Sequence, residues 1–486
     1  MSEIKEKTVT GLLWSAIENF ANIGIQFIIG IILARLVAPK EFGLIGMITI
    51  FIAISHTFIE GGFMKGLIRK TNVSDVDYST AFFYNLAVGC LLYLILFLSA
   101  EVIARFYSEP ELKALIRVLG INLIIGSFTI VQSAILIRRI DFKMSAKIKV
   151  TSAIVSGSIA IYLAYQGFGV WSLVFRVVLE RLFTAILLWF WNSFFPSLVF
   201  SIASFKELFG YGSKLLISGL IHVIFTNIYL VIIGKFFSPA ELGYYVRADK
   251  FNNFTPVIMT NIIATVTFPV FSQMRHNIID LKAAYKRMLK TTMLWSFCLS
   301  IGMVVVAEPM ILSLIGEVWK PSIIYLQMLC FIGMIYPLSA LNLNVINVFG
   351  RSDLFLKLEV IKKILTIPII FIGIIWGIKA MILGMWVNTL FGYYLNSYYS
   401  GLFINYPIRE QLRDIIPSLL FAMFMGVFVA LTGYFLPLGN LAKLIIQVTT
   451  GILIVYVVGE LIKFDAFIYT KKIIKEKILS VYNARK

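Results

Sequence analysis

The sequence has little charge. Asp, Glu, Lys and Arg make up 14% of its 486 residues, while 59% are hydrophobic. Soluble domains average about 25% charged and about 45–50% apolar residues, so this composition excludes a soluble globular protein. The alternating segments of about ten residues that mark a membrane β-barrel are also lacking. Apolar runs of about 20 residues recur instead, which predicts an all-α integral membrane protein.

Cysteine and histidine are scarce as well, with three of each. Cys90, Cys298 and Cys330 lie far apart and inside apolar runs, which favours neither a disulfide framework nor a metal cluster. The sequence has no G-x-x-x-x-G-K-[ST], H-E-x-x-H or C-x-x-C motif, and so no basis for ATP hydrolysis or zinc chemistry. We therefore predict no metal, no cofactor and no enzymatic activity.

The apolar runs fit about fourteen transmembrane helices. Lys and Arg outnumber Asp and Glu by 43 to 25, and most of these bases fall in the two tails and the even-numbered connections. By the positive-inside rule both termini are cytoplasmic, and the excess charge is explained without a nucleic-acid partner. The predicted spans are residues 10–36, 43–66, 80–103, 113–137, 148–166, 169–192, 210–234, 249–273, 291–315, 322–348, 355–377, 379–403, 414–436 and 440–463.

One turn motif occurs twice in the sequence. "ARLVAPKEFG" at 34–43 and "GKFFSPAELG" at 234–243 share a base, Pro, Glu and Gly at constant spacing. The offset contains an even number of predicted helices, which indicates a parallel repeat of two six-helix bundles around a central cavity. Pro and Gly would stop one helix and start the next, with Glu41 as a cap. We predict bundles at 1–200 and 201–405, then two helices and a basic cytoplasmic tail at 406–486.

The repeat continues upstream in polar residues spaced by four, which form a narrow stripe on each helix. Asn19 widens the first stripe and Lys214 extends the second. Such faces point into a bundle or at a water-filled cavity, with interhelical hydrogen bonding as the alternative for the uncharged members. The aligned residues are Glu18, Asn22 and Gln26 in the first copy and Ser218, His222 and Thr226 in the second.

The second predicted span carries an ionisable pair. His56 and Glu60 are one helical turn apart, so they could interact on one face. The dipeptide Gly61-Gly62 follows directly and would loosen the helix there.

More charges lie in later spans. Arg176 and Glu180 have the spacing of a self-neutralising pair, which leaves Arg181 without a partner from its own helix. Arg247 and Lys250 lie near an outer helix end, where anchoring at the headgroups competes with a role in a cavity.

Several of these segments resemble one known family. The run from Gly11 to Lys70, with its "GLLWS" helix, "LAR-L--P-E-G" turn and Gly-rich second helix, resembles the polysaccharide-transport branch of the multidrug/oligosaccharidyl-lipid/polysaccharide flippase superfamily. Three later pieces are similar to the same branch, and the helix count agrees over essentially the whole chain. They are "LIRRIDFK" at 136–143, "SPAELGYYVRADKF" at 238–251 and "FPVFSQM" at 268–274.

The resemblance implies a Wzx-type flippase of the bacterial inner membrane. Such proteins move undecaprenyl-pyrophosphate-linked oligosaccharides to the outer leaflet for O-antigen, capsule or exopolysaccharide assembly, alongside a polymerase and glycosyltransferases. Without an ATPase, transport would proceed by alternating access, either passively or coupled to a proton or sodium gradient. The alternatives are a cation-coupled multidrug exporter of the same superfamily and a membrane glycosyltransferase or polymerase.

The ionisable and polar residues inside the spans divide into three candidate roles on this hypothesis. Bases would neutralise the diphosphate, amides would meet sugar hydroxyls, and titratable groups would couple transport to an ion or proton. The diphosphate candidates are Lys214, Arg176, Arg181, Arg247 and Lys250. The sugar candidates are Asn19, Asn22 and Gln26. The coupling candidates are Glu18, His56, Glu60 and His222.

Overall fold

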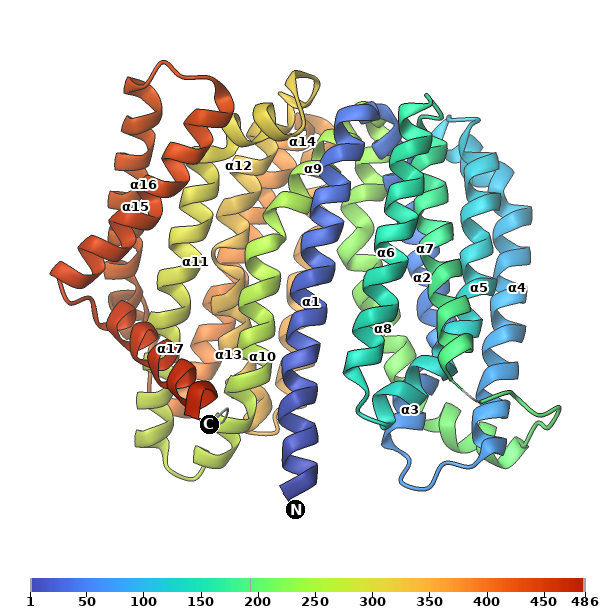
Figure 1. Ribbon diagram of the computed structural model, residues 1–486. Helices are drawn as coiled ribbons and strands as arrows, with labels where there is room; N and C mark the ends of the chain where they lie inside the picture. The colour runs from blue at the N-terminus through green and yellow to red at the C-terminus, as the bar shows by residue number, and fades with distance from the viewer. Residues whose placement is uncertain (1, 193, 484–486) are drawn as a thin grey trace. The chain divides into compact units, whose positions relative to one another are not determined.

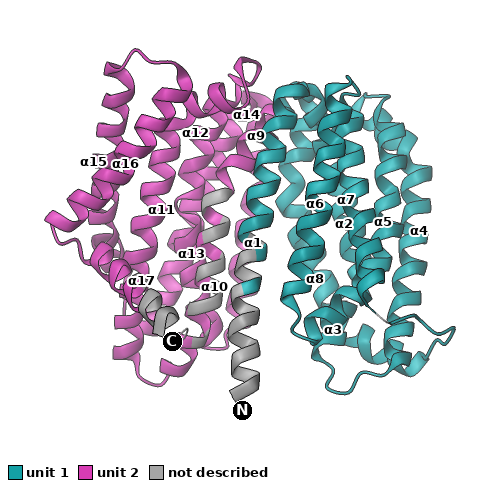
Figure 2. Cartoon of the chain, in the orientation of Figure 1, with its two compact units in different colours: residues 1–243 teal, residues 244–486 magenta. Residues whose placement is uncertain are grey.

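The computed structural model describes residues 2–192 and 194–483, and its regular elements are helices throughout this part of the chain (Figure 1). The chain divides into two compact units, residues 1–243 and 244–486, coloured teal and magenta in Figure 2. The units follow the packing of the helices. The division at 1–200, 201–405 and 406–486 concerns the sequence repeat and remains a prediction.

Unit 1 is a bundle of long helices. Helix α1 packs on α6, α6 on α7 and α4 on α5, while α2 contacts both α5 and α8. Helix α9 (Pro239–Asn252) begins in unit 1 and continues into unit 2. The other helices of unit 1 are α1 (Ser2–Leu36), α2 (Pro39–Glu60), α3 (Phe63–Arg69), α4 (Asp75–Tyr107), α5 (Leu112–Arg138), α6 (Phe142–Tyr165), α7 (Val170–Trp191) and α8 (Ile202–Phe236).

Unit 2 is built around α11. This helix packs on α10, α12, α15 and α16, and the buried side chains of Tyr285, Leu289, Met293 and Phe297 place it at the centre of the apolar core. The helices of unit 2 are α10 (Phe254–Met274), α11 (Ile278–Leu314), the short 3₁₀ helix η1 (Glu317–Trp319), α12 (Ser322–Gly333), α13 (Tyr336–Val348), α14 (Ser352–Ile404), α15 (Ile408–Phe435), α16 (Asn440–Leu461) and α17 (Asp465–Asn483).

Helix α14 folds back on itself at Gly377. This glycine has φ +89°, a conformation that other residues rarely adopt. A Cβ atom on Gly373 would touch Met381, and one on Gly384 would touch Ile369, so the two halves run antiparallel. The 53 residues therefore supply two membrane crossings, in agreement with the separate spans predicted at 355–377 and 379–403.

All fourteen predicted spans fall on helices, and the all-α membrane fold is confirmed. Ten segments in the described chain are long and apolar enough to cross a membrane. The count is lower than fourteen partly because α14 counts once and the described apolar part of α1, Phe20–Leu36, is short. Helix α7 is absent from the ten although it has 22 residues. It carries three charged residues, Arg176, Glu180 and Arg181, more than any of the ten carries in its apolar stretch.

The two copies of the repeated turn pack against each other. A Cβ atom on Gly43 would lie 1.8 Å from the Pro239 carbonyl oxygen, and one on Gly243 would lie 1.9 Å from that of Pro39. Only glycine allows this reciprocal approach. The Glu41 carboxylate accepts a hydrogen bond from the Ala38 amide at 3.1 Å, which confirms the predicted cap of α2.

The break between α2 and α3 also depends on close backbone contact. Gly61 and Gly62 have positive φ angles of 46° and 74°, and a Cβ atom on Gly62 would lie 2.4 Å from the Cα of Gly212 in α8. The predicted loosening of the helix at this dipeptide is confirmed, since α2 ends at Glu60 and α3 begins at Phe63.

Arg138, within the "LIRRIDFK" segment, fixes the end of α3. Its guanidinium donates hydrogen bonds to the carbonyl oxygens of Leu67 at 2.6 Å and Thr71 at 3.1 Å. Lys70 then bridges Asp77 of α4 and Glu207 of α8 at 3.0 and 2.9 Å. The hydrogen bond to Glu207 raises the pKa of Lys70 further above its ordinary value, so the bridge stays charged at neutral pH.

Candidate functional site

Unit 1 contains a charged cluster inside its membrane-spanning helices, which we call the His56 cluster (Gln26, His56, Glu60, Glu180 and Arg181). His56 Nδ1 lies 3.4 Å from Glu60 Oε1 on α2, so the predicted pair is confirmed. On its other side, His56 Nε2 is hydrogen-bonded to the Arg181 guanidinium of α7. Because arginine can only donate, Nε2 is the acceptor and Nδ1 carries the proton that faces Glu60.

The cluster also reaches α1. Gln26 Nε2 donates a hydrogen bond of 2.8 Å to Glu180 Oε1, across 154 residues of sequence. Within the described chain no ion pair within 4 Å joins Arg176 to Glu180, but the two charges still attract each other along α7. The guanidinium of Arg181, which the sequence left without a partner, lies against Gly126 of α5, where a Cβ would be only 3.6 Å from Nε.

The His56 cluster is only partly covered. The side chains of His56 and Glu60 are 31% and 50% exposed. They are preceded on α2 by "FGLIGMITIFIAIS", a stretch without charge. An ionisable side chain at this depth cannot face hydrocarbon without a large cost, so the exposed side of the cluster requires water or a polar ligand. Arg181 can offer charge-assisted hydrogen bonds to an anion, and His56 and Glu60 can exchange protons.

A second ion pair lies nearby in sequence on α1. Glu18 is buried, and its Oε1 accepts from Lys149 Nζ of α6 at 2.5 Å and lies 3.5 Å from Ser145 Oγ. Lys149 was not among the predicted site residues, because bases at a cytoplasmic helix end also serve as topology signals. Its place inside the predicted span 148–166 was the available clue.

Among the candidates whose side chains are described, the others of unit 1 form no hydrogen bond or ion pair with the cluster. Asn22 is half-buried on α1, whereas the side chain of Asn19 lies outside the described residues. Lys214 and His222 are exposed on α8. Thr226, the third member of that stripe, donates to the His222 carbonyl oxygen of its own helix at 2.8 Å.

Arg247 and Lys250 belong to unit 2. Arg247 is buried, with its guanidinium 5.4 Å from the centroid of the Trp319 ring, and Lys250 is exposed at the end of α9. A cation in this position is attracted to the electron-rich face of the aromatic ring. In the described chain, no group of three His, Cys, Asp or Glu residues is placed to hold a metal ion.

Solved structures share this architecture. The inward-closed conformation of the lipid II flippase MurJ matches 93% of this chain and 99% of its own length, with a TM-score of 0.74 and 15% identity. An inward-facing multidrug resistance transporter of the MATE family matches 85% of this chain and 94% of its own, with a TM-score of 0.59 and 15% identity. At these identities the similarity concerns the fold.

Curated relatives cover most of the sequence. The lipopolysaccharide biosynthesis protein WzxC of Escherichia coli is 24% identical over 87% of this chain and 86% of its own. The succinoglycan biosynthesis transport protein ExoT of Rhizobium meliloti is 25% identical over 99% and 97%. The teichuronic acid biosynthesis protein TuaB of Bacillus subtilis is 26% identical over 73% and 74%.

A family match completes the comparison. The family described as "Polysaccharide biosynthesis protein" matches residues 32–324, which is more than half of the chain and includes α2 to α8. The protein therefore belongs to this family of polysaccharide biosynthesis proteins.

Proposed function

We propose that the protein is a flippase for lipid-linked oligosaccharides. It moves undecaprenyl-pyrophosphate-linked sugar units from the cytoplasmic to the outer leaflet of the bacterial inner membrane, by alternating access. Its relatives are named for lipopolysaccharide biosynthesis and for succinoglycan biosynthesis transport, and its fold is shared with a lipid II flippase. Both termini lie in the cytoplasm, and a polymerase and glycosyltransferases act on the same lipid-linked sugars.

The observation that carries the proposal is the half-exposed His56 cluster within otherwise apolar helices. A lipid-linked oligosaccharide has an anionic diphosphate and a hydroxyl-rich head that must cross hydrocarbon. A polar, water-filled path with a fixed arginine would shelter such a head while the polyprenyl tail stays in the bilayer.

The residues divide by chemistry. Arg181 offers two parallel donors to the diphosphate, and Arg176, Lys214, Arg247 and Lys250 supply further positive charge. Asn19, Asn22 and Gln26 on α1 meet sugar hydroxyls. These assignments rest on residue type and on the position of the residues within spans.

Energy for net movement comes from a gradient. The sequence has no ATP-binding motif, so transport is passive or coupled to protons or sodium. Glu60 and His56 are the leading coupling groups, because they adjoin Arg181 and are half-exposed. Glu18 and His222 are the further candidates.

Deletion of the gene tests the function. We expect undecaprenyl-linked repeat units to accumulate on the cytoplasmic face and to return to the outer leaflet on complementation. Normal outer-leaflet exposure in a deletant without a paralogue would refute the proposal. Because a multidrug transporter shares the fold, sensitivity to ethidium is measured in the same strains and should not change.

A further inference from the structure

The C-terminal tail forms an amphipathic helix. Helix α17 (Asp465–Asn483) packs against α11 and α16 through buried residues that include Ala466 and Phe467. Lys471, Lys472 and Lys475 of the same helix are exposed. A helix with one apolar and one basic face lies in the plane of the membrane interface.

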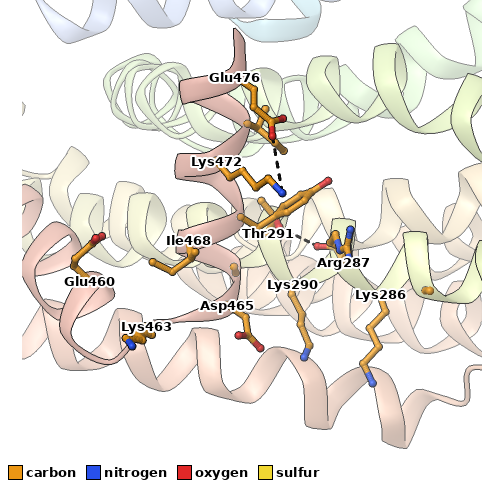
Figure 3. Close-up of a pocket in the computed structure, with 14 residues that line it drawn as sticks. Lys286, Arg287, Lys290, Thr291, Glu460, Lys463, Asp465, Ile468, Lys472 and Glu476 are labelled. Carbon is orange, nitrogen blue, oxygen red and sulfur yellow. Dashed lines mark hydrogen bonds and ion pairs between the residues drawn. The ribbon is translucent and has the colours of Figure 1, made fainter. Parts of the chain in front are cut away.

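A cavity of about 1050 Å³ lies between α17, the first turns of α11 and the end of α16 (Figure 3). Lys472 extends from α17 toward α11, and Arg287 of α11 lies 5.1 Å from the centroid of the Tyr469 ring of α17. The cavity is therefore formed by packing within unit 2. Its charged lining residues are Lys286, Arg287, Lys290, Lys463, Lys472, Glu460, Asp465 and Glu476.

Bases outnumber carboxylates in this lining. Lys286 and Lys290 form ion pairs with Asp414 at 2.9 and 3.3 Å, and Lys472 lies 3.9 Å from Glu476. Arg287 and Lys463 are exposed and form no ion pair within 4 Å with a described carboxylate. The cavity thus holds positive charge that its own carboxylates do not neutralise.

An apolar groove of about 490 Å³ adjoins the cavity along α11. Trp295, which lines the groove, donates a hydrogen bond of 3.1 Å to Thr470 of α17, and Thr291 of the cavity lies one helical turn before it. The groove continues between α11 and α16 past Leu299 and Ile452, both exposed where a bilayer would cover them.

We propose that this composite site binds an acidic membrane phospholipid. The headgroup phosphate binds Arg287, Lys463 and Lys472, and one acyl chain lies in the groove beside Trp295. Basic pockets at helix ends near a membrane interface bind anionic headgroups. A free soluble anion has no acyl chain that could fill the apolar groove. Phospholipid is the occupant because the lining is basic and the bilayer supplies phospholipid at far higher concentration than any polyprenyl lipid; at comparable dissociation constants the more concentrated ligand occupies the site.

Native mass spectrometry of the full-length protein tests the site. Wild type is titrated with tetraoleoyl cardiolipin, dioleoyl phosphatidylglycerol and dioleoyl phosphatidylcholine. We expect preferential binding of the two acidic lipids, and at least a tenfold loss of their affinity in the triple variant Arg287→Gln, Lys463→Gln, Lys472→Gln. Each base near an acidic headgroup contributes about fivefold at most, less when screened.

Two matched variants give controls. Lys320→Gln, Lys357→Gln, Lys475→Gln removes the same charge from exposed positions outside the cavity and should bind as wild type does. The triple variant Arg287→Lys, Lys463→Arg, Lys472→Arg keeps the charge and should bind acidic lipid with an affinity within about threefold of wild type. This result would show that the Gln triple variant loses affinity through loss of charge and not through misfolding. Undiminished acidic-lipid binding in the Gln triple variant would overturn the proposal. Displacement of phospholipid by equimolar undecaprenyl phosphate would also overturn it, by assigning the site to the cargo lipid.

Discussion

The two units hold their polar groups in different ways. In unit 1, His56 and Glu60 bring ionisable groups to the last turn of α2, where they are partly exposed, and Arg181 brings a charge to the middle of α7. In unit 2, a fully buried network is uncharged: Asn342 Oδ1 accepts hydrogen bonds from Tyr285 at 2.8 Å and Ser400 at 2.5 Å. The ion pairs of α11 with α15 lie near the starts of those helices, at Glu410 and Asp414.

The difference between the charged cluster of unit 1 and the neutral network of unit 2 indicates which polar groups stabilise the fold and which serve transport. The neutral network of unit 2 shows that amides and hydroxyls suffice to join helices of this protein. A charge in mid-membrane costs about 2.5–3.5 kcal/mol on insertion scales, which favours a functional role for a partly exposed charged cluster at that depth. We therefore assign the His56 cluster to transport and the Asn342 network to stability, and the following changes test that division.

Arg181→Gln should have the largest effect on transport. It removes the donors that we assign to the cargo diphosphate, and charge-assisted hydrogen bonds contribute about 1.5–3 kcal/mol each, so we expect about a hundredfold slower flipping. The measurement is restoration of surface polysaccharide in the deletant, at matched protein levels. Arg351→Gln, which breaks an exposed pair with the neighbouring Asp353, is the control and should restore fully.

Asn342→Ala should instead reduce stability. The change leaves the Tyr285 and Ser400 hydroxyls buried without their acceptor, which should cost about 2–3 kcal/mol of unfolding free energy. Transport by the folded fraction should stay within twofold of wild type. Denaturant unfolding in detergent measures the free energy of unfolding. The control is Asn347→Ala, at an exposed position on the same helix, which should change the free energy of unfolding by less than about 0.5 kcal/mol. A transport defect in Asn342→Ala protein of unchanged stability would contradict the assignment of the Asn342 network to stability alone.

Gly43→Ala tests whether unit 1 owes its stability to close packing rather than to its charges. The added methyl group would overlap the Pro239 carbonyl, so we expect a loss of about 2 kcal/mol. Gly24→Ala makes the same change on α1 where nothing lies within 4 Å, and it should be neutral or slightly stabilising. Equal stability of the two variants would contradict the reciprocal turn contact.

Glu60→Gln sharpens the assignment within the cluster. It keeps the side chain's size and removes its titration, so the response of transport to an imposed proton gradient should fall about tenfold while passive flipping remains. Proteoliposomes with and without the gradient give both values. Glu101→Gln, a carboxylate paired with Arg105 and Lys113 on the exposed surface of α4, should leave the response intact.

The Glu18–Lys149 pair should show the smallest effect. Lys149 is 52% exposed, so solvent screens the interaction. A double-mutant cycle on the free energy of unfolding, with Gln at each position, should therefore give a coupling energy of about 1 kcal/mol or less. A much larger coupling would mean that unit 1 depends on its charges for folding.

The helices could be predicted because long apolar runs are sufficient evidence for a membrane helix. The His56–Glu60 pair was predictable for a similar reason, since both residues lie on one helix at a fixed spacing. The contact of His56 with Arg181 was not, because it joins residues 125 positions apart and no sequence pattern relates them. Helix α17 was predicted only as a basic tail, since its lysines interrupt the apolar residues and leave no long apolar run.

The most direct test of the central claim is flipping by purified protein in liposomes. A fluorescent undecaprenyl-diphosphate oligosaccharide in the inner leaflet becomes reducible by external dithionite only after translocation. We predict rapid loss of fluorescence with wild type, and loss about a hundredfold slower with Arg181→Gln of equal stability. Equal rates for the two proteins would contradict the assignment of the His56 cluster to the path of the cargo.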